Sequence, residues 1–340
     1  MKILVIRYRF IGDTILMIPF LRNLRYAYPE AQIDVLAGPV SGEILEDCPY
    51  IDELVVFDTT RKHRYENTET EKKSFWSYVQ LLKQRKYDKV YVLKRSLSSA
   101  ALAFFAGIKH RIGYNTECRG ILLTERVPYL KNRHEVECFL DVLRCDNISI
   151  RDTHLENWIS PESEQKVSDY LDNDKLKILI HATSGNINKQ WPPEHFARII
   201  QYLSNKLKAR IYYTGTQEDS AIYDNIHSLI PTELDVEPVN LCGKLSIKDS
   251  TALISKMNLA IGSDSGTLHI AASVNVPVIG IYGPMNPKKW VTWGDIHTPL
   301  YADLKCIPCD LKKPCPLDIE CLEQVTPEKV IEILHLYLNL

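Results

Sequence analysis

Short segments rich in hydroxyl groups, glycine and charged side chains follow several predicted strands of this 340-residue chain. One of them, Asp264-Ser265-Gly266, separates a predicted buried strand at 258–261 from a helix expected over 265–274, which carries His269. Ligands of open α/β sheets bind at the carboxyl ends of the strands. The first amides of a helix can also hold an anion. The spacing therefore predicts an anion site at this turn.

Two further junctions favour a nucleoside diphosphate as the anion. Thr183, Ser184 and Lys189 follow a predicted strand at 177–181, where small hydroxyl residues and a lysine suit a diphosphate. Glu218 follows the next strand, where a carboxylate could accept hydrogen bonds from ribose hydroxyls. Each signal alone is weak, because helix N-termini collect Ser, Thr, Asp and Glu for structural reasons. Three in succession favour a nucleotide site.

Asp13 lies where the first predicted strand, at 2–7, gives way to a helix in the stretch RYRFIGDTILMIP. As a helix N-cap it would contribute ~1 kcal/mol to stability. As a functional group it would be a carboxylate at the carboxyl edge of a sheet, ready to take a proton. His269 has two interpretations of the same kind, a satisfied core histidine or a site residue.

Strands alternate with helices in two successive series, a pattern typical of parallel sheets with right-handed crossovers. The pattern pauses near 148–174 and then restarts. We therefore expect one domain over 1–165, a second over 175–325 and a closing helix over 326–340. The chain contains neither G-x-G-x-x-G nor G-x-x-x-x-G-K-[ST]. A dinucleotide fingerprint and a P-loop are thus absent.

Composition excludes several classes of protein. The net charge of −2 lacks the basic excess of a nucleic-acid binder, so no nucleic-acid partner is expected. The first apolar run is too short for a signal peptide, and no stretch approaches the ~18 apolar residues of a membrane span. These features favour a cytoplasmic protein.

Four of the nine cysteines fall within 16 residues, with the spacing C-x2-C-x5-C-x5-C. These are Cys306, Cys309, Cys315 and Cys321. Tetrathiolate metal sites usually contain two C-x2-C pairs, and this segment contains one. A reduced cluster or facultative disulfides are therefore favoured over a structural metal, and no catalytic metal is expected.

The chain resembles glycosyltransferase family 9, the ADP-heptose:lipopolysaccharide heptosyltransferases, nearly from end to end. The resemblance rests on stretches such as IRYRFIGDTILMIPFLRNLR, HATSGNINKQWPPEHF and GSDSGTLHIAASVNVPVIGIYGPMNP. The pattern D-[ST]-G-x-x-H-x-A-A is the most specific, and the cysteine-rich tail is most similar to the heptosyltransferase II branch. The resemblance implies an α/β GT-B fold, in which two Rossmann-like domains with parallel sheets face each other across a cleft. The N-terminal domain would bind the acceptor and the C-terminal domain the nucleotide sugar.

The resemblance also implies an activity, which is inverting transfer of heptose from ADP-L-glycero-D-manno-heptose to a hydroxyl of the lipopolysaccharide inner core. No metal or other cofactor would be required. Asp13 would be the general base, and Lys189 would assist the departing diphosphate. The residues implied at the donor are Thr183, Ser184, Lys189, Glu218, Lys244, Leu245, Asp264, Ser265, Gly266 and His269.

Acceptors of this family are acidic, Kdo-containing lipid A–core sugars, which implies a peripheral position at the inner face of the inner membrane. Arginine binds carboxylates and phosphates with paired donors. The basic residues implied at the acceptor are Arg61, Lys62, Arg64, Arg95 and Arg119. Arg111 lies in the same region, and the run from Arg61 to Arg64 also has the composition of a solvated charged loop.

Three alternatives remain at this stage. A GT-B transferase could use another nucleotide sugar. A GT-B sugar-nucleotide epimerase or hydrolase would need further acid–base groups, for which the donor domain offers only His269 and Glu218. A non-catalytic nucleotide-sugar-binding protein is disfavoured because simple binding requires neither Asp13 nor Lys189.

Overall fold

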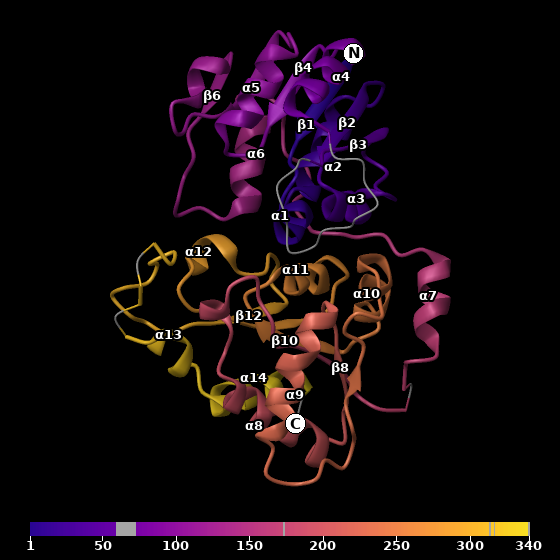
Figure 1. Cartoon of the computed structure of the whole chain (residues 1–340), viewed down its shortest axis with the longest axis vertical. Helices are drawn as coiled ribbons and strands as arrows, with labels where there is room; N and C mark the ends of the chain where they lie inside the picture. The colour runs from indigo at the N-terminus through magenta and orange to yellow at the C-terminus, as the bar shows by residue number, and fades with distance from the viewer. Residues whose placement is uncertain (59–72, 173, 313, 316, 339–340) are drawn as a thin grey trace. The chain divides into compact units, whose positions relative to one another are not determined.

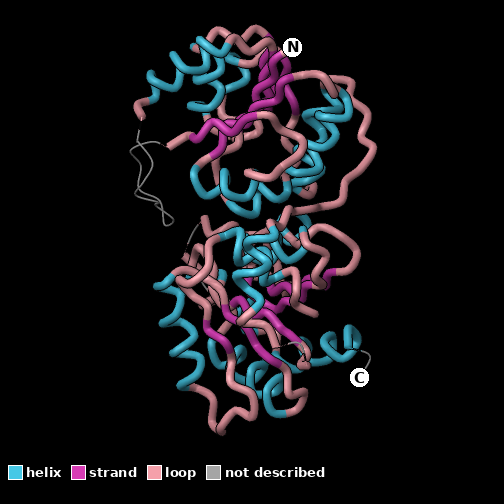
Figure 2. Tube along the Cα trace, turned by 90° about the vertical axis from the view of Figure 1, so that its right-hand side faces the viewer, coloured by secondary structure: helices cyan, strands magenta, loops and turns pink. Residues whose placement is uncertain are grey.

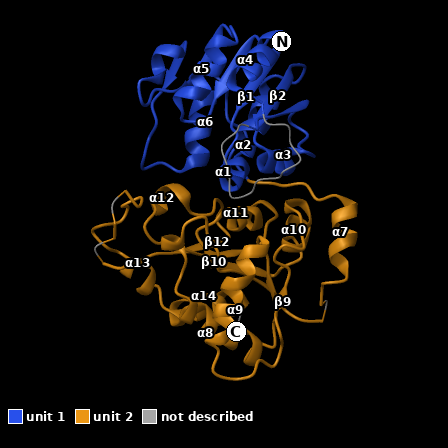
Figure 3. Ribbon diagram, viewed as in Figure 1, with its two compact units in different colours: residues 1–154 blue, residues 155–340 orange. Residues whose placement is uncertain are grey.

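The structure, a computed structural model, describes residues 1–58, 73–172, 174–312, 314–315 and 317–338 (Figure 1). The chain divides into two compact units, unit 1 over Met1–His154 and unit 2 over Leu155–Leu340 (Figure 3). Within each unit, helices cover both faces of a sheet, as the cyan and magenta segments of Figure 2 show. The fold is therefore α/β with two Rossmann-like units, as predicted.

The strands described in unit 1 form a six-stranded sheet in the order β3-β2-β1-β4-β5-β6, with every pair parallel. They are β1 (Lys2–Ile6), β2 (Gln32–Ala37), β3 (Glu53–Val56), β4 (Lys89–Val92), β5 (His110–Tyr114) and β6 (Glu125–Val127). The central strand β1 has the sequence KILVI, and Ile3 to Ile6 are fully buried. Such β-branched runs are typical of strands covered on both faces.

The helices of unit 1 connect these strands and cover the two faces of the sheet. They are α1 (Ile11–Leu16), α2 (Ile18–Ala27), α3 (Pro39–Leu45), α4 (Phe75–Arg85), α5 (Leu97–Phe105), the 3₁₀ turn η1 (Arg119–Leu122) and α6 (Glu135–Cys145). The segment after β1 forms two short helices, α1 and α2, with Met17 between them. Pro19 explains the interruption, because proline has no amide hydrogen to continue the ladder of α1.

Unit 2 repeats the same plan with the order β12-β11-β10-β7-β8-β9 among its described strands, again all parallel. The strands are β7 (Lys177–His181), β8 (Arg210–Tyr213), β9 (Val239–Asn240), β10 (Leu259–Ser263), β11 (Val278–Ile281) and β12 (His297–Leu300). The helices are α7 (Pro161–Ser168), α8 (Pro193–Asn205), α9 (Ser220–Ser228), α10 (Ile247–Ile254), α11 (Gly266–Ser273), α12 (Pro287–Trp290), α13 (Glu320–Glu323) and α14 (Pro327–Leu338), with 3₁₀ turns η2 (Ile187–Lys189) and η3 (Gln217–Asp219).

Both sheets reverse their strand order next to the first strand. In unit 1 the chain adds β2 and β3 on one side of β1 and then β4 on the other, and unit 2 does the same around β7 with β10. Such a reversal is the topological switch point at which doubly wound sheets bind ligands, because the loops leave the two strands in opposite directions. The predicted site residues that follow β1, β7 and β10 therefore all lie at a switch point.

The sequence pattern predicts a first domain over 1–165, and the two compact units divide between His154 and Leu155. Asn23 of α2 holds the chain to unit 1 by accepting from the Arg151 amide at 2.7 Å and donating to the Asp152 carbonyl at 2.6 Å. Helix α7 instead joins unit 2, where Lys166 forms an ion pair with Asp249 of α10. Residues 155–165 therefore associate with the second unit.

The closing helix α14 belongs to unit 2 and packs against α8 and β11. Its buried residues Val330 and Leu334 join the core of that unit. Trp191, ahead of α8, donates its indole hydrogen to the Val325 carbonyl at 2.7 Å, just before α14 begins. Among the residues the structure describes, no helix combines the length and apolar character needed to cross a membrane.

A substitution at Gly262 of β10 would test how tightly the backbone is packed at the switch point of unit 2. A Cβ at this position would lie 2.5 Å from the carbonyl oxygen of His181, its partner on β7. Since that oxygen belongs to the backbone, Gly262→Ala should lower the free energy of unfolding by about 1–3 kcal/mol, measured by urea denaturation.

Gly42 of α3 provides the matched control. A Cβ there would meet nothing within 4 Å, and alanine is favoured over glycine in a helix by roughly 0.5–1 kcal/mol. Gly42→Ala should therefore preserve or raise stability. Equal stability of Gly262→Ala and the wild type would contradict this packing.

Candidate functional site

The switch point of unit 2 is closed by contacts of the Asp264 segment with the loop that follows β7. The Lys189 ammonium lies 2.8 Å from a carboxylate oxygen of Asp264. Ser184 donates its hydroxyl hydrogen to the Asp264 backbone carbonyl at 2.8 Å. The loops that follow β7 and β10 thus meet at Asp264. This contact positions Lys189 beside the start of α11.

The N-terminus of α11 adds further hydrogen-bond donors beside this lysine. Ser265 is its N-cap residue, and the helix begins at Gly266. The Ser265 hydroxyl is buried and has no hydrogen-bond partner within the described part of the chain. Since the first amides of a helix also lack intrahelical partners, this turn presents several donors next to one cation. That arrangement suits a phosphate or diphosphate.

The remaining predicted donor residues differ in exposure. Thr183 and His269 are 3% and 5% exposed, so both are enclosed at the same end of the sheet. Glu218 lies in η3 and is exposed. Lys244 is exposed and Leu245 is half-buried, in the segment that follows β9.

The switch point of unit 1 holds Asp13, which is 8% exposed. Its carboxylate forms an ion pair with Arg7, itself 3% exposed, and accepts from the Phe10 amide at 3.3 Å. Helix α1 begins at Ile11, so Asp13 is the third helical residue and not the N-cap. Sequence spacing misplaced the helix start because it could not show that the side chain turns back onto the Phe10 amide.

Two cations near Asp13 were missed from the sequence, namely Arg7 and Lys94. Lys94 follows β4 on the other side of the switch point. Burial and the positive charge of Arg7 lower the pKa of Lys94 to about 8, although Asp13 opposes this shift. The signal in the sequence that could have identified these two cations is the presence of basic residues just after each strand, in RYRF and in LKRS. These cations make the surroundings of Asp13 attractive to an anion.

Arg95 and Arg119 form a second group of donors in unit 1. Arg119 is 1% exposed and pairs with Glu117 at 2.7 Å through one nitrogen. Its other two guanidinium nitrogens, the Arg95 Nε, the Tyr114 hydroxyl and the Thr116 hydroxyl are buried without hydrogen-bond partners among the described residues. We call these four residues the arginine cradle.

Electrostatics within the arginine cradle favour an anion. Burial lowers the pKa of Arg119, and the positive charge of Arg95 lowers it further against the effect of Glu117. The Arg95 guanidinium lies 4.0 Å from the centre of the Tyr129 ring, which holds it in place. Because buried polar groups are normally hydrogen-bonded, the unpaired donors fit a carboxylate or phosphate.

The other predicted acceptor residues do not join this group. Arg61, Lys62 and Arg64 lie outside the described residues. Arg111 donates to the carbonyls of Ile108 and Leu122, at 2.5 and 2.6 Å, and to that of Lys109 at 3.2 Å. Its guanidinium therefore fastens β5 to η1, which is a structural role.

The cysteine cluster contains free thiols. Cys321 is buried, and burial together with the nearby thiols of Cys315, Cys306 and Cys309 raises its pKa to about 11. The Ile319 amide donates to the Cys315 sulfur at 3.3 Å. Among the residues described, no group of three or more Cys, His, Asp or Glu side chains is arranged to hold a metal ion.

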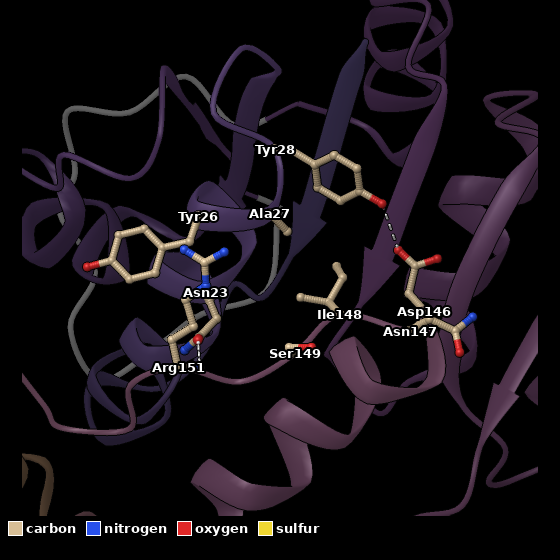
Figure 4. A pocket seen from close by; sticks show the side chains of 9 residues that line it. All are labelled: Asn23, Tyr26, Ala27, Tyr28, Asp146, Asn147, Ile148, Ser149 and Arg151. Atoms are coloured by element: carbon tan, nitrogen blue, oxygen red, sulfur yellow. Dashed lines mark hydrogen bonds between the residues drawn. The ribbon is translucent and has the colours of Figure 1, made fainter.

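A polar pocket of about 300 Å³ lies at the other edge of the unit 1 sheet (Figure 4). Tyr28 points its hydroxyl at Asp146, whose carboxylate also pairs with Lys89, the first residue of β4, at 2.6 Å. Asn23 is satisfied by the backbone of residues 151 and 152. The polar groups of this pocket thus bond one another, which indicates a structural role.

Two Rossmann-like units, each with polar residues gathered at its switch point, are the architecture of the GT-B fold. Residues 75–319 match the sequence model of glycosyltransferase family 9 (heptosyltransferase). The chain therefore belongs to glycosyltransferase family 9, as the motifs predict, and is a glycosyltransferase.

Similar proteins agree with this membership. The chain is 27% identical to lipooligosaccharide heptosyltransferase 2 of Haemophilus influenzae, over 98% of this chain and 99% of that one. It is 26% identical to lipopolysaccharide heptosyltransferase 2 of Salmonella typhimurium, over 100% and 99%. The structure of Escherichia coli ADP-heptose lps heptosyltransferase II has the same fold, with a TM-score of 0.80, 23% identity and coverage of 99% and 98%.

The lowered pKa of Lys94 gives a testable consequence for stability. Lys94→Met should raise the free energy of unfolding at pH 7, because it removes a cation that the fold disfavours. The pKa is about 8 in the folded chain against 10.5 for the ordinary group, so the unfolded state binds more protons between these values. The gain should therefore shrink as pH rises from 8 to 10.5, measured by urea denaturation at several pH values.

Lys83→Met is the matched control, since Lys83 lies exposed on α4. It should change stability little at any of these pH values. A gain for Lys94→Met that does not vary with pH, or a loss at pH 7, would contradict the position assigned to Lys94.

Proposed function

We propose that this protein transfers heptose from ADP-heptose to a hydroxyl of an acidic sugar in the lipopolysaccharide inner core, with inversion and without a metal ion. The observation that carries the proposal is the buried carboxylate of Asp13, ion-paired to Arg7 at the switch point of unit 1. The relatives from Haemophilus influenzae and Salmonella typhimurium are by name heptosyltransferases of lipooligosaccharide and lipopolysaccharide, which supports the sugar and the acceptor.

Unit 2 binds the donor in this proposal. Lys189 and the N-terminus of α11 hold the diphosphate, together with Thr183, Ser184, Ser265 and Gly266. Glu218 receives the ribose hydroxyls, the backbone at Lys244 and Leu245 faces the adenine, and His269 completes the pocket. The Lys189–Asp264 contact of 2.8 Å supports this assignment, because it keeps the lysine beside the first amides of α11.

Unit 1 binds the acceptor. Arg95 and Arg119 of the arginine cradle take a carboxylate or phosphate of the acceptor, since their buried guanidinium nitrogens have no partner among the described residues. Charge-assisted, paired hydrogen bonds of this kind are short and strong. Lys94 adds positive charge between the arginine cradle and Asp13. Arg61, Lys62 and Arg64 extend this basic region in the proposal.

The chemistry is a single displacement. The acceptor hydroxyl oxygen attacks the anomeric carbon of the heptose from the face opposite the diphosphate, and its proton passes to the Asp13 carboxylate. The bond from the anomeric carbon to the diphosphate oxygen breaks, and ADP leaves with the electron pair. Lys189 and the α11 amides stabilise the charge that develops on ADP. Because these groups supply the positive charge, the reaction requires no metal ion.

Removal of the proposed base should separate chemistry from binding. Asp13→Asn keeps the size of the side chain but cannot take the proton, so transfer should slow by about 10²–10⁴-fold. ADP affinity, measured by titration calorimetry, should stay unchanged because unit 2 is untouched. Transfer is measured as ADP release from ADP-heptose in the presence of a Kdo-containing acceptor.

Three outcomes would contradict the proposal. Asp13→Asn at the wild-type rate would remove Asp13 from the role of base. Loss of wild-type transfer in EDTA, restored by a divalent cation, would refute metal independence. A preference for UDP or GDP over ADP in the same calorimetric titrations would retain the transferase and discard ADP-heptose.

A further inference from the structure

Three exposed aromatic residues of unit 1 form a continuous surface, which we call the aromatic ridge. Trp76 of α4 and Phe104 and Phe105 of α5 are 59%, 43% and 48% exposed. The ring centres of Trp76 and Phe105 are 5.3 Å apart, and those of Phe104 and Phe105 are 5.5 Å apart. The two helices pack against each other in the same unit (Figure 1). Contiguous exposed aromatic groups of this kind mark interaction sites.

The two stretches of chain that carry the aromatic ridge are rich in lysine and arginine, of which Arg85 is ion-paired with Glu53 and Asp34. Residues 73–86 contain four Lys or Arg, residues 94–116 contain four more, and neither stretch contains Asp or Glu. Lys83 and Lys109 are exposed. Arg111 lies 5.3 Å from the centre of the Phe104 ring. In a chain with a net charge of −2, this is a marked local segregation of positive charge.

We propose that the aromatic ridge docks this protein on an anionic lipid bilayer. Tryptophan and phenylalanine enter the headgroup region of a bilayer, and neighbouring lysines and arginines are attracted to anionic lipids. The inference extends the proposed function, in which the acceptor carries lipid. Helix α5 begins two residues after Arg95 and ends at the aromatic ridge, so one rigid element connects the arginine cradle to the docking surface.

Charge argues against a second copy of the chain as the occupant of this surface. A twofold dimer uses the same patch on both subunits. Lys83, Lys109 and the other cations of one copy would then face the same cations of the other, with no acidic residue in either stretch to compensate. An anionic bilayer meets the same cations with opposite charge.

The test is flotation of the full chain with vesicles of phosphatidylethanolamine and phosphatidylglycerol, compared with vesicles of phosphatidylcholine alone. The wild type should bind the anionic vesicles, more weakly as salt rises. We expect the partition constant for anionic vesicles to fall by about tenfold in each of two double variants, Trp76→Ser/Phe105→Ser and Lys83→Glu/Lys109→Glu. Leu336→Ser is the control, because Leu336 is a 72% exposed apolar residue on α14 of unit 2.

A second assay distinguishes this inference from the proposed transfer reaction. Both double variants should transfer heptose to a deacylated, water-soluble acceptor at the wild-type rate, because the residues changed lie outside the arginine cradle and the donor site. Vesicle binding without any transfer in the wild type would contradict the proposed function and leave the docking surface intact. Wild-type binding by the aromatic variant, equal loss in Leu336→Ser, or self-association through the ridge with no vesicle binding would overturn the inference.

Discussion

The reversal of strand order beside the first strand of each sheet is the constraint on which the site depends. Parallel strands direct their carboxyl ends to one edge, and a reversal sends the loops of two adjacent strands apart. In unit 1 this occurs between β1 and β4, and in unit 2 between β7 and β10. Polar groups can gather there without displacing a crossover helix.

Both switch points contain a buried carboxylate paired with a cation. Asp13 pairs with Arg7 in unit 1, and Asp264 pairs with Lys189 in unit 2. Taking charges out of water costs free energy that the attraction within a pair only partly returns. Lys94 adds to this cost, since its pKa of about 8 shows that the fold disfavours its charge. Proteins keep such locally unfavourable groups chiefly at functional sites, and this is how we interpret both switch points.

Much of the fold could be predicted from the sequence because its determinants are local. Buried β-branched runs such as KILVI and KILIH alternate with helical spacing, and this pattern indicates two parallel sheets. The turn Asp264-Ser265-Gly266 was also placed correctly, between a strand and a helix. Here the small residues and the flanking periodicities agree.

The parts that were missed depend on contacts distant in sequence or on the direction of a side chain. Nothing in the spacing shows that Arg111 binds backbone carbonyls of its own neighbourhood, or that Asp13 accepts from the Phe10 amide. The unpaired donors of Arg119 depend on its burial next to Arg95, across 24 residues of chain. The aromatic ridge was missed because α4 and α5 contribute to it from different parts of the sequence.

The central claim is that the switch point of unit 2 holds the nucleotide diphosphate, and hydrogen–deuterium exchange with and without ADP tests it most directly. The account predicts that ADP slows amide exchange at 183–189 and at 264–269, while amides around Asp13 and Arg119 exchange as before. Protection confined to unit 1, or no protection at either segment of unit 2 under saturating ADP, would contradict it.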